Sequence, residues 1–325
     1  MRTFGLVVLL SFAAAAAGVP VLAPNDSDTT FRTLLNAPPT LPHVRGDDGA
    51  WHAPFIYRWA LVNQLEQRYE QDRSTRVPLN WLTGGRLVGS SDEGRSPLML
   101  LGADSYGRDV FSRLLFGARI SLGLAAVSAL GALVLGGTVG ALAGYAGGTA
   151  DDVLMRASDF VLVLPATYVA LALRSALPLV LTAQTVFLLL AGIFALVGAP
   201  FFARGVRAIV RSERQLDYAA AARSLGAGHT RVLVRHLLPA ARGFMVVQLT
   251  MLVPAFIIAE ATLSFVGLGF PDPIASWGTM LHDASSVRVF ADFPWLLSPA
   301  AAMFLVVLAL NLVLERTTAL IVQSR

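Results

Sequence analysis

Residues 218–241 read YAAAARSLGAGHTRVLVRHLLPAA, and the chain on both sides of this stretch is almost free of charge. The alanines predict a helix. Gly226 predicts a turn because glycine readily adopts a positive φ, and Pro239 predicts the end of a second short arm. Arg231 and Arg235 lie four residues apart, which is the spacing of neighbours on one helix face. The pattern indicates a short basic element with two arms.

The residues alone leave two interpretations of this element open. Ala220, Ala221 and Ala222 would give the first arm a thin face that can lie in a groove of another protein. The alternative is an ordinary loop helix that packs against the hydrophobic segments of its own chain.

The composition places the chain among membrane proteins. It has 325 residues, of which 55% are hydrophobic and 14% are charged, and its mean hydropathy is +0.63. Ordinary soluble domains have roughly 25% charged residues. A membrane span needs about 20 apolar residues. Six spans are predicted from the charge-free runs at residues 3–25, 120–150, 160–173, 175–203, 243–259 and 293–314. The run at 160–173 reaches residue 177 if Arg174 extends its charged end to the membrane surface.

The residue types exclude several kinds of chemistry. All 25 basic residues are arginines, and the chain has no cysteine. Without lysine there is no Walker A phosphate-binding loop and no Schiff base. Without cysteine there are no disulfides or thiolate metal sites, and the five histidines lack metal-ligand spacing. We therefore expect no catalytic, cofactor-binding or metal-binding residue in this chain.

The arginines also predict the orientation in the membrane, because cytoplasmic loops are enriched in basic residues. Segment 204–242 carries eight arginines against two acidic residues, so it is expected to be cytoplasmic. With six spans, both termini then lie in the cytoplasm and residues 26–101 lie on the opposite side.

The N-terminal part is expected to consist of an anchor and an extracytoplasmic segment. Residues 1–25 resemble a cleaved signal peptide, but the even number of spans favours a retained transmembrane anchor. After it, residues 25–49 are expected to be irregular and residues 56–74 helical, with a hairpin around Gly84-Gly85. The alternative for residues 26–101 is a poorly ordered insert.

Four glycines recur at four-residue spacing in the second predicted span: Gly136, Gly140, Gly144 and Gly148. On a membrane helix this spacing allows the backbone of another helix to approach closely. Helix packing is therefore predicted for all four. The alternative is that membrane helices are simply rich in glycine.

Three stretches together resemble a known family. They are GADSYGRDVFSRLLFGARISL (102–122), the stretch at 218–239, and EATLSFVGLGFPDPIASWGTML (260–281). In this order they resemble the inner-membrane permease subunits of binding-protein-dependent ABC importers, most closely the C-type subunit of the dipeptide, oligopeptide and nickel group. The resemblance covers residues 102–325. It implies an all-α membrane protein with the type I ABC importer permease bundle of six transmembrane helices, here with an extracytoplasmic insert between the first two.

The family's cytoplasmic signature is Glu-Ala-Ala, three residues, Gly, and Leu-Pro twelve residues later. The residues that match it are Ala221, Ala222, Gly226, Leu238 and Pro239, and His236 matches a histidine common in this subgroup. Ala220 stands where the family has Glu, which puts a charge contact at that site in doubt. Asp217, one turn earlier, could replace it or be an ordinary solvated residue. The resemblance implies that loop 204–242 couples the chain to ATPase subunits.

The first of the three stretches is amphipathic. Val110, Phe111 and Leu114 are expected to lie opposite the arginines of residues 107–122, so that this helix follows the membrane surface before entering it. Arg108 and Asp109 are adjacent and point in different directions, which argues against a catalytic pair.

Glu260 is an acidic residue preceded by seventeen uncharged residues. Carboxylates inside a membrane are costly and are usually functional. With Ser264, Gly267 and Gly269, it is a candidate for the translocation path or a gate. The alternative is a buried hydrogen-bond anchor that braces the LSFVGLG turn.

The chain is therefore expected to be one half of a heterodimeric pore in the bacterial inner membrane, which imports peptides or a related small solute such as nickel. The resemblance implies three kinds of partner: a second permease subunit, two ATPase subunits that bind ATP and Mg, and an extracytoplasmic solute-binding protein; nucleic acid is not expected. An ion-coupled secondary transporter is the alternative, but it needs buried ionisable residues and only Glu260 qualifies. A membrane-anchored enzyme built on residues 26–119 would need a catalytic constellation that is not recognisable there.

Overall fold

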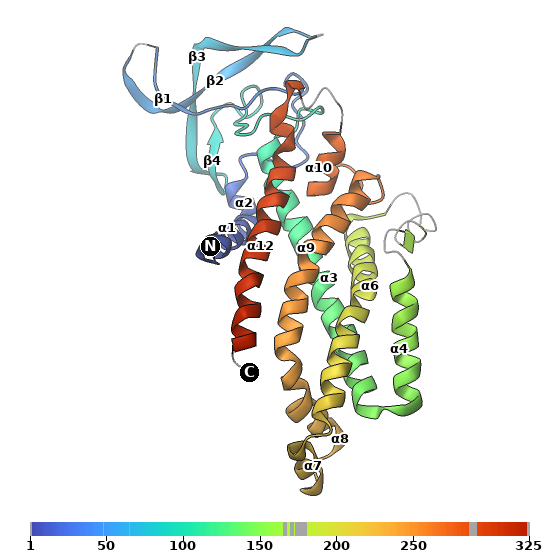
Figure 1. The fold of residues 1–325 in the computed structure, drawn as a ribbon. Coiled ribbons are helices and arrows are strands. Elements are labelled where there is room, and N and C mark those ends of the chain that lie inside the picture. The colour runs from blue at the N-terminus through green and yellow to red at the C-terminus, as the bar shows by residue number, and fades with distance from the viewer. Residues whose placement is uncertain are drawn as a thin grey trace. The chain divides into compact units, whose positions relative to one another are not determined.

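The computed structural model describes residues 2–47, 49–64, 66–164, 168–169, 172, 181–285 and 291–323 (Figure 1). The chain forms two compact units. The helix unit comprises residues 1–6, 122–263 and 307–325, and the sheet unit comprises residues 7–121 and 264–306. The helices are α1 (Arg2–Ala17), α2 (Val19–Leu22), α3 (Val110–Ala146), α4 (Gly148–Val163), α6 (Ala183–Glu213), α7 (Asp217–Ser224), α8 (His229–Arg231), η1 (Val232–Leu237), η2 (Leu238–Ala241), α9 (Arg242–Phe265), α10 (Trp277–Asp283), η3 (Pro294–Leu297) and α12 (Ser298–Gln323).

Four helical segments among the described residues are long and apolar enough to cross a membrane: Val110–Ala146, Ala183–Glu213, His229–Phe265 and Pro294–Leu314. The first predicted span forms the 16-residue helix α1 and, after Gly18, the short helix α2 with Pro20 in its first turn. In the third predicted span, residues 165–167, 170–171 and 173 lie outside the described residues, and so do residues 175–180 at the start of the fourth. The count of six spans therefore stays a prediction.

Three of the four helical segments are longer than the charge-free runs that predicted them. Helix α3 has 37 residues, which corresponds to a length of roughly 55 Å at about 1.5 Å per residue. The hydrocarbon core of a membrane is only about 30 Å thick, so the ends of such a helix must extend beyond it. The N-terminal end of α3 carries Arg119, the charged residue that closed the apolar run on that side.

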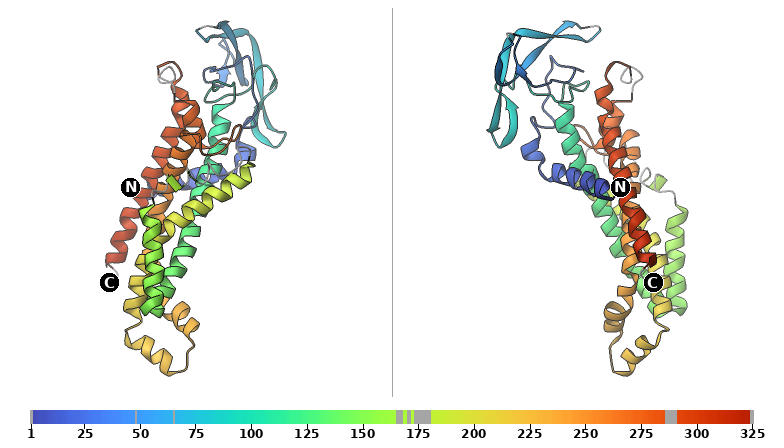
Figure 2. Two further views of the ribbon diagram at one scale, coloured as in Figure 1. Left: turned by 90° about the vertical axis from the view of Figure 1, so that its right-hand side faces the viewer. Right: turned by 60° about the vertical axis from the view of Figure 1, so that its left-hand side comes forward.

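The sheet unit contains a four-stranded antiparallel sheet in the order β1-β2-β3-β4, so the expectation of an all-α protein is wrong for this part of the chain. The strands are β1 (His43–Arg45), β2 (Trp51–Asn63), β3 (Arg68–Thr83) and β4 (Arg86–Ser90), and Figure 2 shows them from two further sides. The hairpin predicted around Gly84-Gly85 is confirmed, because Thr83 pairs with Arg86 and both glycines have a positive φ. Two residues with positive φ are what the tightest hairpin turn requires.

The helix predicted for residues 56–74 is wrong, because this segment forms parts of β2 and β3. Trp59 pairs with Gln71, and Leu61 pairs with Tyr69 across the hairpin. The residues that suggested an apolar helix face are not buried together, since Leu61 and Val62 are exposed. Tyr, Trp, Val and Ile favour strands, and the sheet supplies pairing partners that lie far away in the sequence.

Helices α3 and α6 of the helix unit approach each other at backbone distance. A Cβ atom on Gly136 would lie 2.0 Å from the carbonyl oxygen of Ala199, and one on Gly140 would lie 2.3 Å from that of Ala203. Gly144 makes the same kind of contact with Arg207 at 2.6 Å. Three small residues on one helix face thus let two membrane helices pack without intervening side chains.

Among the described residues Gly148 makes no such contact, so helix packing stays a prediction for it. Helix α3 ends at Ala146, and Gly147 and Gly148 form the turn to α4 with φ values of +68° and +57°. A Cβ atom on Gly148 would meet no described atom within 4 Å. The four-residue repeat of glycines extends past the end of α3. Its last member, Gly148, adopts a positive φ, which glycine does readily.

Candidate functional site

Helix α7 forms the first arm of the basic element and ends in a glycine-closed turn. The amide of Ala227 donates to the carbonyl of Ala222, and the amide of Gly226 donates to the carbonyl of Arg223. This pair of hydrogen bonds is the Schellman motif, which needs a residue with positive φ after the helix. Gly226 supplies it with a φ of +81°.

Exposed apolar side chains on α7 and at both of its ends form what we call its apolar tip. Leu225 is 88% exposed, Leu216 is 47% exposed and Tyr218 is 41% exposed. Ala220 and Ala221 are also exposed, so two of the three alanines of the predicted face are open to solvent. Asp217 lies exposed in the first turn, one turn before Ala221.

The opposite side of α7 is anchored in the helix unit. Ala219 is fully buried in a cluster with Val206 and Val210 of α6 and with Val232 and Leu237 of the second arm. Ala222 and Ala227 pack against the same cluster. The structure therefore combines the two interpretations: one face of α7 packs against its own chain, and the other is free.

The second arm does not stop at Pro239, so that prediction is wrong. Residues His229–Phe265 form one continuous helical segment, in which the π-helix η1 and the 3-10 turn η2 connect α8 to α9. Pro239 lies in the first turn of η2, where its missing amide hydrogen is tolerated. A wide turn followed by a tight one lets the helix pass the proline without ending.

A groove of about 520 Å³ lies between the two arms. Its lining includes Tyr218 and Leu225 of the first arm and Arg231, Arg235 and His236 of the second. Both arginines are exposed and His236 is half-buried. Burial and a 2.6 Å hydrogen bond to Glu213 raise the pKa of Tyr218 to about 12, so the ring stays neutral. The groove thus places an aromatic ring and apolar side chains next to two positively charged arginines.

Two of the eight arginines in segment 204–242 contribute to the packing of helices α4 and α6. The Asp151 side chain of α4 is 5% exposed and pairs with Arg207 of α6, whose Nη2 lies 2.6 Å from Asp151 Oδ2. Arg211 pairs with the same carboxylate at 3.5 Å. The sequence analysis counted these arginines only as signals of orientation. They also hold α4 and α6 together.

Glu260 lies near the end of α9, and Gly267 and Gly269 follow that end. Glu260 is 1% exposed. Gly267, with a φ of +83°, turns the chain after α9, and its amide donates to the Ser264 carbonyl. A Cβ atom on Gly269 would lie 1.8 Å from Ser264 Oγ, so the chain folds back tightly there. These contacts give both glycines a role in shaping the LSFVGLG turn.

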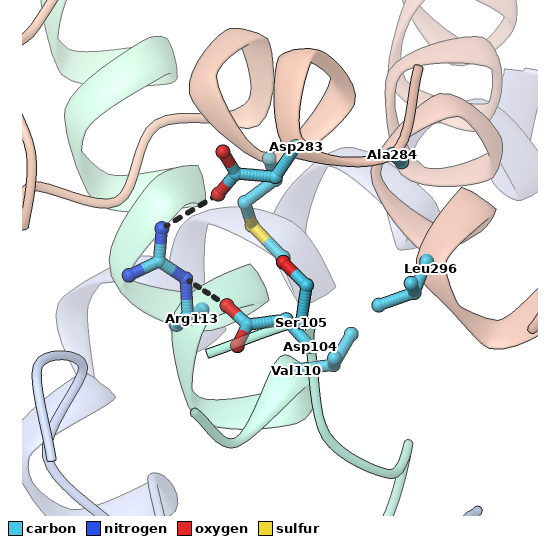
Figure 3. A pocket seen from close by; sticks show the side chains of 8 residues that line it. Asp104, Ser105, Val110, Arg113, Asp283, Ala284 and Leu296 are labelled. Atoms are coloured by element: carbon cyan, nitrogen blue, oxygen red, sulfur yellow. Dashed lines mark ion pairs between the residues drawn. The ribbon is translucent and has the colours of Figure 1, made fainter. Parts of the chain in front are cut away.

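A buried charge cluster in the sheet unit was missed by the sequence analysis. Arg108, 2% exposed, donates from Nε to Asp104 at 2.7 Å, from Nη1 to Asp272 at 2.6 Å and from Nη2 to Asp283 at 2.8 Å. Arg113 is 1% exposed. Figure 3 shows its guanidinium between Asp104 and Asp283, at 3.6 and 3.7 Å. The cluster ties the start of α3 to residues more than 150 positions later in the sequence.

The amphipathic surface helix predicted for residues 107–122 is therefore wrong. This segment forms the first turns of α3, and two of its three arginines point into the charge cluster rather than toward solvent. The four-residue spacing of Asp104 and Arg108 was the available signal. Burial raises the pKa of Asp283, whereas Arg108 and Arg113 lower it.

Asp109 caps the start of α3. Its carboxylate accepts hydrogen bonds from Ser112 Oγ at 2.5 Å and from Asn25 Nδ2 at 3.0 Å. Burial raises the pKa of Asp109 to about 6, and these donors act in the opposite direction. The side chains of Asp109 and Arg108 thus bond to different partners.

The chain is similar in sequence to a family of known transport proteins. Residues 136–325 match the sequence profile of the family described as "Binding-protein-dependent transport system inner membrane component". The chain is 40% identical over 225 residues to the glutathione transport system permease protein GsiD of Pectobacterium atrosepticum, covering 68% of this chain and 71% of the relative. It is 34% identical over 213 residues to the oligopeptide transport system permease protein OppC of Bacillus subtilis, covering 65% and 67%.

One solved structure shows the same fold. The chain resembles a structure titled "Inward facing conformations of the MetNI methionine ABC transporter", with a TM-score of 0.51 and 18% identity. The likeness covers 64% of this chain and 96% of the other. With several membrane-spanning helices and the family match over more than half of its length, the chain belongs to the inner-membrane permease components of binding-protein-dependent ABC importers.

Proposed function

We propose that this chain forms half of the translocation pathway of an ATP-driven importer for peptides. Its relatives include permease proteins named for glutathione, oligopeptide and dipeptide transport. Membership in a binding-protein-dependent family favours this function over the ion-coupled transporter. The observation that carries the proposal is the apolar tip of α7, which is open to solvent on one side and anchored in the helix unit on the other.

Helix α7 is the proposed contact with an ATPase subunit. A conformational change driven by ATP hydrolysis must be transmitted through a rigid part of the permease. The cluster around Ala219 provides such a connection, because it joins α7 to α6 and to the second arm. Leu225 and Tyr218 would enter an apolar groove of the ATPase, while Arg231 and Arg235 face its rim. The proposed assembly has two ATPase subunits, which bind ATP and Mg, a second permease subunit and a soluble binding protein.

The test of this function is peptide uptake. Cells that lack the chain should lose uptake of a labelled tripeptide, and restoring it together with its partner subunits should restore ATP-dependent uptake. Uptake that persists after the ATP supply is removed but the ion gradients are kept would favour the ion-coupled alternative.

The proposed orientation places the sheet outside and loop 204–242 in the cytoplasm. Ser91 in the sheet unit and Ser212 at the end of α6 are both exposed, and the chain has no cysteine of its own. Ser91→Cys should therefore react with a membrane-impermeant thiol reagent in intact cells, whereas Ser212→Cys should react only after the cells are opened. The reverse pattern would overturn the orientation and the proposed cytoplasmic position of both termini.

Glu260 is proposed to act in transport more than in folding. The carboxylate is 1% exposed in a helix that can span a membrane, where charged groups are rarely kept without a function. Glu260→Gln keeps the size and hydrogen-bonding capacity of the side chain, so abundance in the membrane should change little while peptide uptake falls about tenfold, a change of roughly 1.4 kcal/mol in a barrier. Unchanged uptake would remove Glu260 from the proposed translocation path.

A further inference from the structure

A pocket of about 630 Å³ lies in the sheet unit, where the β2–β3 turn meets the segment that leads into α12. This volume is within the range of small-molecule binding sites, roughly 300–1,000 Å³. Asn36, Gln67, Arg68, Tyr69, Phe293 and Trp295 line it. The pocket is separate from the charge cluster of Figure 3, with which it shares no lining residue.

Two residues of this pocket have strained backbones. Asn36 has a φ of +54° and Gln67 a φ of +52°, and the side-chain amide of Asn36 donates to Gln67 Oε1 at 2.9 Å. Residues other than glycine rarely adopt such values, and those that do concentrate at functional sites. Asn36 is 8% exposed, and no described residue donates a hydrogen bond to its Oδ1. A buried amide oxygen without a donor indicates that a ligand or water supplies one.

Aromatic rings form the walls, and their polar atoms are already bonded elsewhere. Tyr69 donates from its hydroxyl to the Leu35 carbonyl at 2.7 Å, and Trp295 donates from Nε1 to the Ala103 carbonyl at 3.1 Å. Burial raises the pKa of Tyr69 to about 12, so this ring is neutral. Rings held by such bonds cannot rotate freely, and they offer preorganised apolar faces to a ligand.

Charges of both signs line the same pocket. Arg68 pairs with Glu70 at 3.4 Å, but the two side chains are 67% and 58% exposed. Exposed ion pairs are worth little, at most about 1 kcal/mol, so Arg68 can turn toward a ligand carboxylate at small cost. Glu66 and Asp292 add acidic groups to the lining.

We propose that this pocket binds a short peptide with free termini. Arg68 would pair with the terminal carboxylate, Glu66 and Asp292 would attract the terminal ammonium group, and Asn36 would accept a hydrogen bond from a peptide amide. Tyr69, Phe293 and Trp295 would contact the side chains. The assignment of the ligand as a peptide rests on the proposed function, whereas the existence of the pocket does not.

The experiment measures binding of the tripeptide Gly-Phe-Gly to the full-length chain in lipid nanodiscs by calorimetry, without the binding protein. Arg68→Gln tests the pocket, and Arg73→Gln is the matched control on the same strand. Arg73 is 63% exposed and pairs with Asp47 at 3.4 Å, but it does not line the pocket. Loss of a charge-assisted bond to the carboxylate should weaken binding about tenfold in Arg68→Gln, and Arg73→Gln should stay within about twofold of the wild type.

A second ligand separates carboxylate recognition from general weakening. The C-terminally amidated tripeptide should bind the wild type as weakly as Arg68→Gln binds the free tripeptide, and Arg68→Gln should not distinguish the two ligands. The proposal is overturned if the wild type binds no tripeptide, if it binds only when the binding protein is present, or if amidation has no effect. Peptide uptake in cells is scored separately. Uptake without binding to the purified chain overturns the pocket alone, and binding without uptake overturns the transport function alone.

Discussion

Gly226→Val should release the ATPase subunits and abolish peptide uptake while the chain stays in the membrane at normal abundance. Gly226 has a φ of +81°, which costs a β-branched residue roughly 1 kcal/mol or more. The strain falls on the two hydrogen bonds that close α7, so the angle between the two arms should change. Because no described atom lies within 4 Å of a Cβ at this position, the effect does not come from a clash in the core. Copurification of the ATPase subunits from detergent-solubilised membranes is the measurement.

Gly228→Val is the matched control. Gly228 lies two residues later, and a Cβ placed on it also meets no described atom within 4 Å. Its φ is −66°, a value that any residue adopts. This variant should keep its ATPase subunits and most of its uptake. If both variants release the subunits, added bulk at the tip is the cause. If neither does, α7 is not the proposed docking element.

The two arms show which parts of the site a sequence can predict. Gly226 could be identified because a glycine a few residues after a run of alanines is a local signal for the end of a helix. The structure places Gly226 in the turn that closes α7. The path of the chain past Pro239 could not be predicted in the same way. It depends on η1 and η2, which form where Val232 and Leu237 pack into the cluster with α6. Tertiary contacts overrode the local rule that proline ends a helix.

The errors in the sheet unit have a related cause. The sequence of residues 56–74 holds charged and apolar residues in an order that fits one face of a helix, but strands β2 and β3 gain their stability from pairs such as Leu61 with Tyr69. The charge cluster likewise joins Arg108 to Asp272 and Asp283, which are 164 and 175 positions away. Spacing along the chain reveals partners within a turn or two, and it carries no information about partners at such separations.

Gly136→Ala should lower the thermal stability of the purified chain and its abundance in the membrane. A Cβ at Gly136 would lie 2.0 Å from the Ala199 carbonyl oxygen and 2.8 Å from the Phe202 Cβ, where ordinary contacts are 3.4–4 Å. The obstacle is backbone, so α3 and α6 must separate, and the contacts at Gly140 and Gly144 weaken with them. Membrane helices associate mainly through close packing, and overpacking costs roughly 1–3 kcal/mol. The midpoint of thermal unfolding in detergent is the measurement.

Gly137→Ala on the same helix provides the comparison that isolates this packing effect. Its Cβ would have no described neighbour within 4 Å, while the substitution adds the same methyl group and gives the helix the same gain of up to about 1 kcal/mol in propensity. Gly137→Ala should therefore unfold at or above the wild-type temperature, and Gly136→Ala several degrees below it. Equal midpoints for the two variants would show that α3 and α6 can separate without cost, and that the small residues of α3 do not determine its distance from α6.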